Sequence, residues 1–191
     1  MSAKEIPTFY PQNIQEWRQW LEQNHQQMDA VWLVMVKKRA NKPTITWSDA
    51  VDEALCFGWI DSIKKTLDEE RSIQFFSKRK PKSTWSKINK QKILNLNEQG
   101  KMMPAGLEVI KIAQQNGSWT ILDEVEALVI PADLEHAFSQ YEGSREYFLN
   151  LSKSAKKLML SWIVLARTPV TRQSRIDKIA EHASRGQLVK F

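Results

Sequence analysis

The sequence predicts an α+β protein in which a small N-terminal sheet with packed helices precedes a helical C-terminal subdomain. Two observations lead to this prediction. Before residue 80, three apolar segments have the composition of β-strands. After residue 83, apolar residues recur at helical spacing between Gly, Pro and Asn breaks. The 191 residues suffice for one domain or two small ones, and we expect a boundary between residues 1–122 and 123–191.

The front part begins with a helix followed by a strand. Asn13 and Glu16 have the spacing of a capping box. The apolar residues behind this box fall on one helical stripe, made of Ile14, Trp17, Trp20 and Leu21. The β-type run 30–38, apolar up to Val36 and ending in two lysines, then predicts a largely buried strand, because a strand covered on both faces shows no polar alternation.

A second helix and a hairpin complete the front part. Thr46 and Asp49 form a capping pair for a helix that ends before Gly58. The segments 59–67 and 71–76 are rich in β-type residues and flank a short acidic turn, so they predict two antiparallel strands.

The rear of the chain is predicted to be helical. Helices are expected from Ser83 or Thr84 to about Gln99, from Pro104 to about Asn116, from Ile130–Pro131 onward, over 151–166 and over 171–184. The acidic stretch 117–131 is the expected joint between the front and the helical rear.

Composition places the chain among ordinary globular proteins, with 42% hydrophobic and 26% charged residues. No apolar run approaches the ~20 residues of a membrane helix, and the N-terminal residues lack the pattern of a signal peptide. The single cysteine, Cys56, excludes an internal disulfide and a cysteine-rich zinc site. We therefore expect a cytoplasmic protein without a membrane span.

The net charge of +6 is unevenly distributed. Residues 71–101 carry nine cations and one acid, and residues 145–191 carry ten cations and three acids. Between them, residues 102–144 carry one cation and seven acids. Two basic blocks around an acidic one favour an anionic partner. The alternative is that the basic residues are solvated faces of helices.

The first basic block contains the candidate ligand site. The run Lys78–Lys82 leads into a predicted helix start, where unpaired N–H groups and nearby cations favour phosphate or carboxylate. A guanidinium matches two oxygens of such a group, and tryptophans can supply flat walls. The predicted ligand-binding residues are Trp59, Asp61, Arg79, Ser83, Trp85, Ser86 and Asn89. Alternatively, Ser83 only caps the helix, the tryptophans are core and Asp61–Arg79 is a structural pair.

Metal binding has one candidate. Asp49, Asp52 and Glu53 share a helical face with Cys56, since steps of three and four residues return to the same side. Three carboxylates can hold a hard cation, but a solvated acidic face near the helix N-terminus is the simpler explanation. In either case the nearby anions raise the pKa of the Cys56 thiol.

Catalytic patterns are lacking in the sequence. The three histidines are dispersed, no Gly-x-Ser-x-Gly elbow occurs, and neither common nucleotide-binding loop is present. The sequence therefore favours a binding protein over an enzyme, with no cofactor and no resident metal.

Several sequence motifs occur together in order. They are ALCFGWID at 54–61, FSKRKPKSTWSKIN at 76–89, GKMMPAG at 100–106 and SWIVLARTPVTRQSRIDKI at 161–179. With these motifs the chain resembles the YdeI/OmpD-associated family of bacterial proteins, roughly from Trp17 to Gly186. The resemblance implies an α+β part followed by a small helical part. The family's names link it to bacteriocin protection, envelope stress and an outer-membrane porin, so a stress or protection role is expected.

Two other functions remain open. Phe75, Phe76 and Trp85 near nine cations suit single-stranded nucleic acid, with a second basic stripe formed by Arg167, Arg172, Arg175 and Lys178. A protein-interaction module is the third possibility, using the adaptable residues Met102, Met103, Met159 and Leu160. The alternative for the last set is core packing on the helical stripe formed by Leu151, Ala155, Leu158, Trp162 and Leu165. The expected partners are thus a small anion, nucleic acid or another protein.

Overall fold

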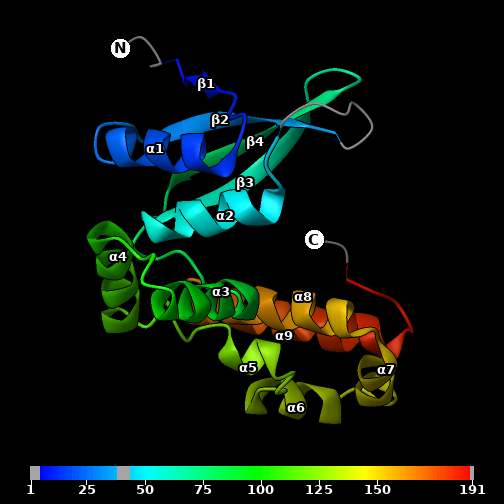
Figure 1. Ribbon diagram of the computed structural model, residues 1–191. Coiled ribbons are helices and arrows are strands. Elements are labelled where there is room, and N and C mark those ends of the chain that lie inside the picture. Colours follow the sequence, from blue (N-terminus) through cyan, green and yellow to red (C-terminus); the bar gives the residue numbers. More distant parts are fainter. Residues whose placement is uncertain (1–4, 38–43, 190–191) are drawn as a thin grey trace. The chain divides into compact units, whose positions relative to one another are not determined.

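The computed structural model describes residues 5–37 and 44–189 and has the predicted α+β architecture. The chain forms two compact units (Figure 1). The front unit contains the residues up to Ser83 together with Ile88–Trp119, and the rear unit contains Thr84–Lys87 and the residues from Thr120 onward. The division expected at residues 122 and 123 stays a prediction, because compactness does not show whether either part folds alone.

The front unit contains a four-stranded mixed sheet. Its strands are β1 (Thr8–Phe9), β2 (Ala30–Val36), β3 (Trp59–Thr66) and β4 (Arg71–Lys78). Their spatial order is β1-β2-β4-β3; β1 runs parallel to β2, and the other pairs are antiparallel. The predicted strand and hairpin are confirmed, although Lys38 of the predicted strand lies outside the described residues. The two residues of β1 are too few to produce a sequence pattern.

Helices follow in both units. The first four are α1 (Ile14–Asn24), α2 (Trp47–Cys56), α3 (Lys87–Glu98) and α4 (Pro104–Gln115). Asn13 caps α1 by accepting a hydrogen bond of 3.0 Å from the Glu16 N–H, and Thr46 caps α2 in the same way from the Asp49 N–H at 3.1 Å. Both predicted caps are confirmed.

The predicted start of α3 is wrong. The helix begins at Lys87, after Ser86, rather than at Ser83 or Thr84. The Ser83 N–H instead donates to the Lys80 carbonyl at 2.9 Å, which closes a turn. The backbone at Ser83 therefore completes a turn, and the helix starts four residues later.

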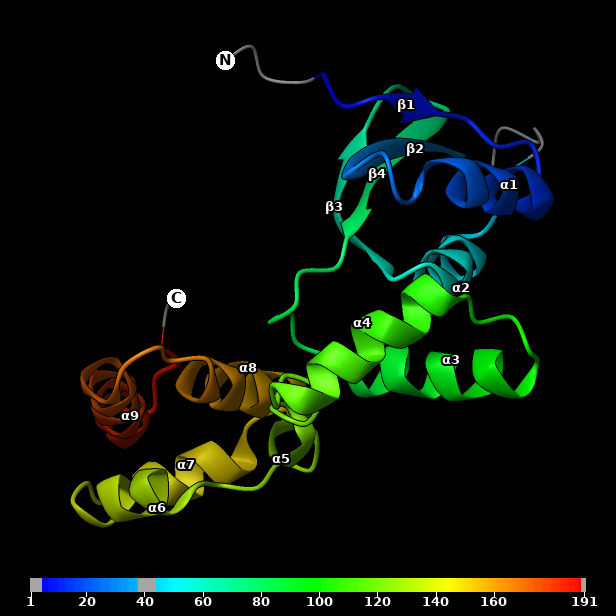
Figure 2. The ribbon, with the colours of Figure 1, turned by 90° about the vertical axis from the view of Figure 1, so that its left-hand side faces the viewer.

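Helices α1 and α2 lie on the same face of the sheet (Figure 2). The ring of Trp17 lies 5.4 Å from that of Phe76, and the ring of Trp20 lies 5.9 Å from that of Trp59. The indole N–H of the fully buried Trp17 donates to the carbonyl oxygen of Ala50 at 3.0 Å. An aromatic core thus joins α1 and α2 to the covered face of the sheet.

Helix α4 approaches the end of α2 very closely. A Cβ atom placed on Gly106 would lie 2.3 Å from the backbone oxygen of Cys56, so only glycine fits there. The Met103 N–H donates to the same oxygen at 3.1 Å. These two contacts fix the start of α4 against α2.

The rear unit is helical. It contains α5 (Asp123–Glu126), α6 (Ala132–Ser139), α7 (Ser144–Asn150), α8 (Lys153–Val164) and α9 (Pro169–Ser184). Thr168 caps α9 by accepting from the Thr171 N–H at 3.1 Å. The predicted helices are confirmed, whereas α5 and α7 are too short to show a helical repeat. Within the described residues, no helix is long and apolar enough to cross a membrane.

The core of the rear unit uses one side of α8. Met159 and Leu160 are buried together with Phe148 and Ile176. In contrast, Leu158 and Leu165 are exposed. Core packing therefore holds for Met159 and Leu160, and the expectation that Leu158 and Leu165 share it is wrong, because the buried stripe is displaced by one residue.

Candidate functional site

The predicted ligand site lies mostly in the interior. Trp59, Trp85 and Arg79 expose only 1%, 2% and 7% of their surface, respectively. Ser83, Ser86 and Asn89 are half-buried. The residues also divide between the units, since Trp85 and Ser86 belong to the rear one. The tryptophan rings present no open face to solvent, so a cleft with these walls stays a prediction.

Asp61 has partners that the sequence did not indicate. Its Oδ2 accepts hydrogen bonds from the indole nitrogen of Trp47 at 2.8 Å and from the side-chain nitrogen of Gln74 at 3.1 Å. Burial lowers the pKa of Arg79 to about 10, while the charge of Asp61 acts in the opposite direction. The guanidinium therefore stays charged at neutral pH, and a structural pairing of Asp61 with Arg79 remains a reasonable alternative to ligand binding.

The acidic face of α2 is not simply solvated. Glu53 is buried and accepts from Arg18 at 2.7 Å, and Asp52 pairs with Lys92 at 2.5 Å. Asp49 accepts from the Thr46 hydroxyl at 2.7 Å. Each carboxylate is thus used inside the front unit. Among the described residues, no group of three or more His, Cys, Asp or Glu side chains is placed to hold a metal ion.

Cys56 lies at the end of this face. Burial raises the pKa of its thiol to about 11, and the negative charge of Glu53 adds to the shift. The predicted direction is confirmed, although burial outweighs the anions that the sequence suggested. A thiol with such a pKa is protonated at neutral pH and is a poor nucleophile.

The sheet face opposite α1 and α2 carries a second group of aromatic residues. Successive side chains of a strand point to opposite faces, so Phe75 lies on the other face from Phe76. Phe75 is paired in register with Trp32, and their rings meet edge-to-face at 4.9 Å and 67°. The Lys65 ammonium lies 4.9 Å from the centre of the Trp32 ring. We call Trp32, Phe75 and Lys65 the open-face cluster.

The open-face cluster is accessible. Trp32 and Phe75 are half-buried and Lys65 is exposed. Both helices that pack on the sheet lie on the other face (Figure 2). Phe76, which the sequence grouped with Phe75, is completely buried against Trp17. Two adjacent phenylalanines in a strand point to opposite faces of the sheet, so their spacing was a signal that one ring would face away from the core. The unbroken apolar run around Trp32 did not indicate which face the Trp32 ring would take.

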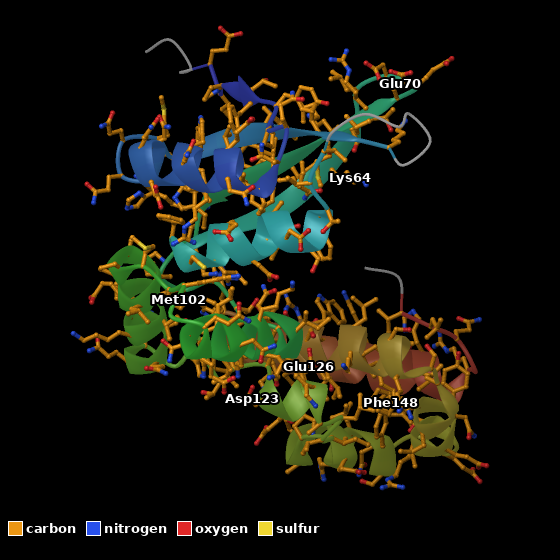
Figure 3. The ribbon with its side chains drawn as sticks, in the orientation of Figure 1. Lys64, Glu70, Met102, Asp123, Glu126 and Phe148 are labelled. Atoms are coloured by element: carbon orange, nitrogen blue, oxygen red, sulfur yellow. The ribbon has the colours of Figure 1, made fainter. Side chains whose placement is uncertain are left out.

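The charge around the cluster is not uniform. Lys64 and Lys65 are exposed on the edge strand β3, and Lys80 and Lys82 are exposed just after β4. At the other end, the hairpin turn carries acidic side chains (Figure 3), one of which, Asp68, pairs with Arg71 at 2.6 Å. An anionic chain would therefore be attracted along β3 and the loop after β4, and repelled at the turn.

The second basic stripe, in the rear unit, is partly used by the fold. Arg172 forms two hydrogen bonds with Asp133, at 2.7 and 3.0 Å. Arg175 lies over the Trp162 ring at 5.1 Å and donates to the carbonyl of the same residue. Only Arg167 and Lys178 of the predicted four are exposed. This stripe is therefore less suited to following phosphates than the sequence suggested.

Two family models match the chain. Residues 9–109 match a domain of unknown function (DUF8412), and residues 127–186 match the family described as Bacteriocin-protection, YdeI or OmpD-Associated. The chain belongs to the first of these families, and its rear residues are similar to the second. The resemblance to YdeI/OmpD-associated proteins is confirmed for the rear motif at 161–179, whereas the front motifs fall within the DUF8412 match. No curated protein and no solved structure matched the chain.

The two matches cover different candidate sites of the protein. The open-face cluster and all seven residues of the predicted ligand site lie within residues 9–109, and α6 to α9 lie within residues 127–186. Neither family description names a ligand or a reaction, so any binding function has to be argued from the side chains.

Proposed function

We propose that the protein binds single-stranded nucleic acid on the open face of its sheet. The observation that supports this is the open-face cluster, two accessible aromatic rings with a lysine beside them. Bases stack on aromatic side chains while cations follow the phosphates, and this combination tolerates any sequence. The bacteriocin-protection name of the family leads us to place this activity in a stress or protection role.

The binding step requires a small rearrangement. Lys65 now lies over Trp32, where a cation–π contact at an exposed site contributes about 0.5–1 kcal/mol. An arriving base takes this place on the ring, and the long lysine side chain moves to a phosphate. Stacking contributes about 1–3 kcal/mol per base, so the exchange is favourable.

The charges give the strand a direction across the sheet. The acidic turn closes one end, since like charges repel a phosphate backbone. The exposed lysines of β3 and of the loop after β4 form the attractive side. We therefore place the bound strand over Trp32 and Phe75, with its phosphates toward Lys65 and the Lys80–Lys82 loop.

Fluorescence anisotropy with a labelled oligonucleotide of about 10 nucleotides tests the proposal. Phe75→Leu keeps an apolar side chain but removes the stacking ring, and we expect affinity to fall about 5- to 100-fold. Tyr141→Leu, a change of an exposed aromatic residue in the rear unit, should leave it unchanged. Lys65→Ala should lower the slope of log affinity against log salt by about 0.7, whereas Lys111→Ala should not.

The proposal fails if the wild-type protein binds no oligonucleotide, or if Phe75→Leu binds as tightly as wild type. Sedimentation of wild type and Phe75→Leu measures whether the open face instead joins two copies of the chain. A wild-type dimer that Phe75→Leu converts to a monomer, without oligonucleotide binding, would assign the open face to self-association.

A small anion near Arg79 is the second candidate. A buried guanidinium that stays charged at neutral pH is the observation that favours it, because a fixed positive charge in the interior attracts phosphate or carboxylate. Inorganic phosphate should then raise the melting temperature of wild type more than chloride at equal ionic strength, and raise that of Arg79→Lys less. Equal effects of the two salts on wild type would remove this candidate.

A further inference from the structure

We propose that the rear unit contains a second binding site, a pocket for an apolar group that carries a positive charge. The pocket is a cavity of about 510 Å³ beside α5 and α8, which lies within the size range of small-molecule sites. Every residue that lines it belongs to the rear unit. It is therefore separate from the open-face cluster in sequence and in structure.

The pocket has an apolar floor and apolar walls. Val125 and Leu160 form buried parts of the lining, and the walls include Ile121, Val129 and Val164. Ile121 and Val129 remain 38% and 47% exposed, although both side chains face a hollow that an apolar group can fill. Covering such surface removes it from water, which is the main favourable term in binding apolar ligands.

An unusual backbone conformation builds one wall. Leu128 has a φ of 58°, a left-handed conformation that is unfavourable for leucine. Two backbone hydrogen bonds hold the turn. The Leu128 N–H donates to the Val125 carbonyl at 3.0 Å, and the Val129 N–H donates to the Glu124 carbonyl at 2.9 Å. This reversal after α5 places Val129 and Pro131 in the lining of the pocket.

The charges at the pocket select the ligand. Among the described residues that line it, Arg172 alone is cationic, and its two hydrogen bonds to Asp133 neutralise it. Asp123 and Glu124 line the same pocket and are exposed (Figure 3 labels Asp123 on α5). With Arg172 neutralised, the exposed carboxylate of Glu124 makes the mouth negative, which favours an ammonium and disfavours a carboxylate.

Three probes with the same apolar part separate the contributions of shape and charge. They are phenylbutylamine, phenylbutanol and phenylbutyrate, titrated into the 191-residue protein and followed by two-dimensional NMR. We expect shifts for residues around Val129 and Val164, with the amine binding tightest, then the alcohol, then the carboxylate. The amine should exceed the alcohol by about 2- to 5-fold, as for an exposed charge pair.

Matched variants locate the site. Val129→Trp fills the pocket from an exposed position and should abolish binding of all three probes, whereas Val170→Trp, at an exposed position outside the lining, should not. Glu124→Gln should narrow the difference in affinity between the amine and the alcohol, and Glu142→Gln, an exposed acid elsewhere in the unit, should not.

Two results would overturn the proposal. Binding that survives Val129→Trp places the probes elsewhere, and a carboxylate that binds as tightly as the amine contradicts the charge assignment. Neither result depends on the oligonucleotide experiment, because that experiment uses another unit and a ligand of the opposite charge.

Discussion

The two faces of the sheet carry similar aromatic residues with different surroundings. On the covered face, Phe76 and Trp59 are buried against α1. On the open face, Phe75 and Trp32 are half-buried and contact each other, and Lys65 lies over the Trp32 ring. Phe75 and Phe76 are neighbours in the chain, so aromatic content alone does not distinguish a core from a binding surface. What distinguishes them is whether a helix covers the ring.

The largest expected effect separates these two phenylalanines. Phe76→Ala should lower the free energy of unfolding by about 3–5 kcal/mol, because it leaves a cavity against Trp17. Phe75→Ala should cost about 1 kcal/mol, since its ring is already partly in water. Urea denaturation of both variants measures the difference. Equal losses of unfolding free energy would mean that the open face is covered in solution, and that the two faces do not differ in burial.

A second pair compares the two tryptophans. Trp17→Phe removes the hydrogen bond to the Ala50 carbonyl and some buried volume, so we expect a loss of about 2 kcal/mol. Trp32→Phe keeps a ring on the open face and should cost less than about 1 kcal/mol. The same denaturation curves decide this, and a larger loss in Trp32→Phe would assign that ring to the core.

Local patterns in the sequence were enough for much of the fold. The caps at Asn13 and Thr46 and the hairpin around the acidic turn depend on residues a few positions apart, which spacing reveals. The start of α3 could not be located from such spacing. Ser83 has the side chain of a cap, but its backbone N–H closes a turn with Lys80. A single residue type served two competing local structures, and the sequence did not show which one formed.

The candidate sites were less predictable, because their contacts join distant residues. Asp61 accepts from Trp47, 14 positions away, and Trp32 meets Phe75 across two strands. Neither pair has a characteristic spacing. Arg79 and Trp59 were predicted to bind a ligand, and composition could not show that both are buried. Charge and aromatic content identify residues worth examining, and the tertiary contacts then decide what those residues are able to do.

A smaller effect tests whether the covered face is independent of the open one. Thr46→Ala removes the cap of α2 and should cost about 1 kcal/mol, whereas Thr46→Ser keeps the hydroxyl and most of the stability. Oligonucleotide affinity should be unchanged in both variants, because α2 packs on the other face. A parallel loss of affinity in Thr46→Ala would show that the two faces are coupled.

The last effect is absent at neutral pH and appears only in alkali. Burial raises the pKa of Cys56 from 9.0 to about 11, so the folded protein holds this proton more tightly than the unfolded chain does. Its contribution to stability is therefore complete below pH 9 and is lost as the pH rises toward 11.

Lysines and tyrosines titrate in the same range, but they do so equally in Cys56→Ala. Wild type should thus lose more unfolding free energy than Cys56→Ala between pH 9 and 11, measured by urea denaturation at each pH. Parallel curves would mean that the thiol is solvated, and that the covered layer is looser at Cys56 than around Trp17 and Phe76.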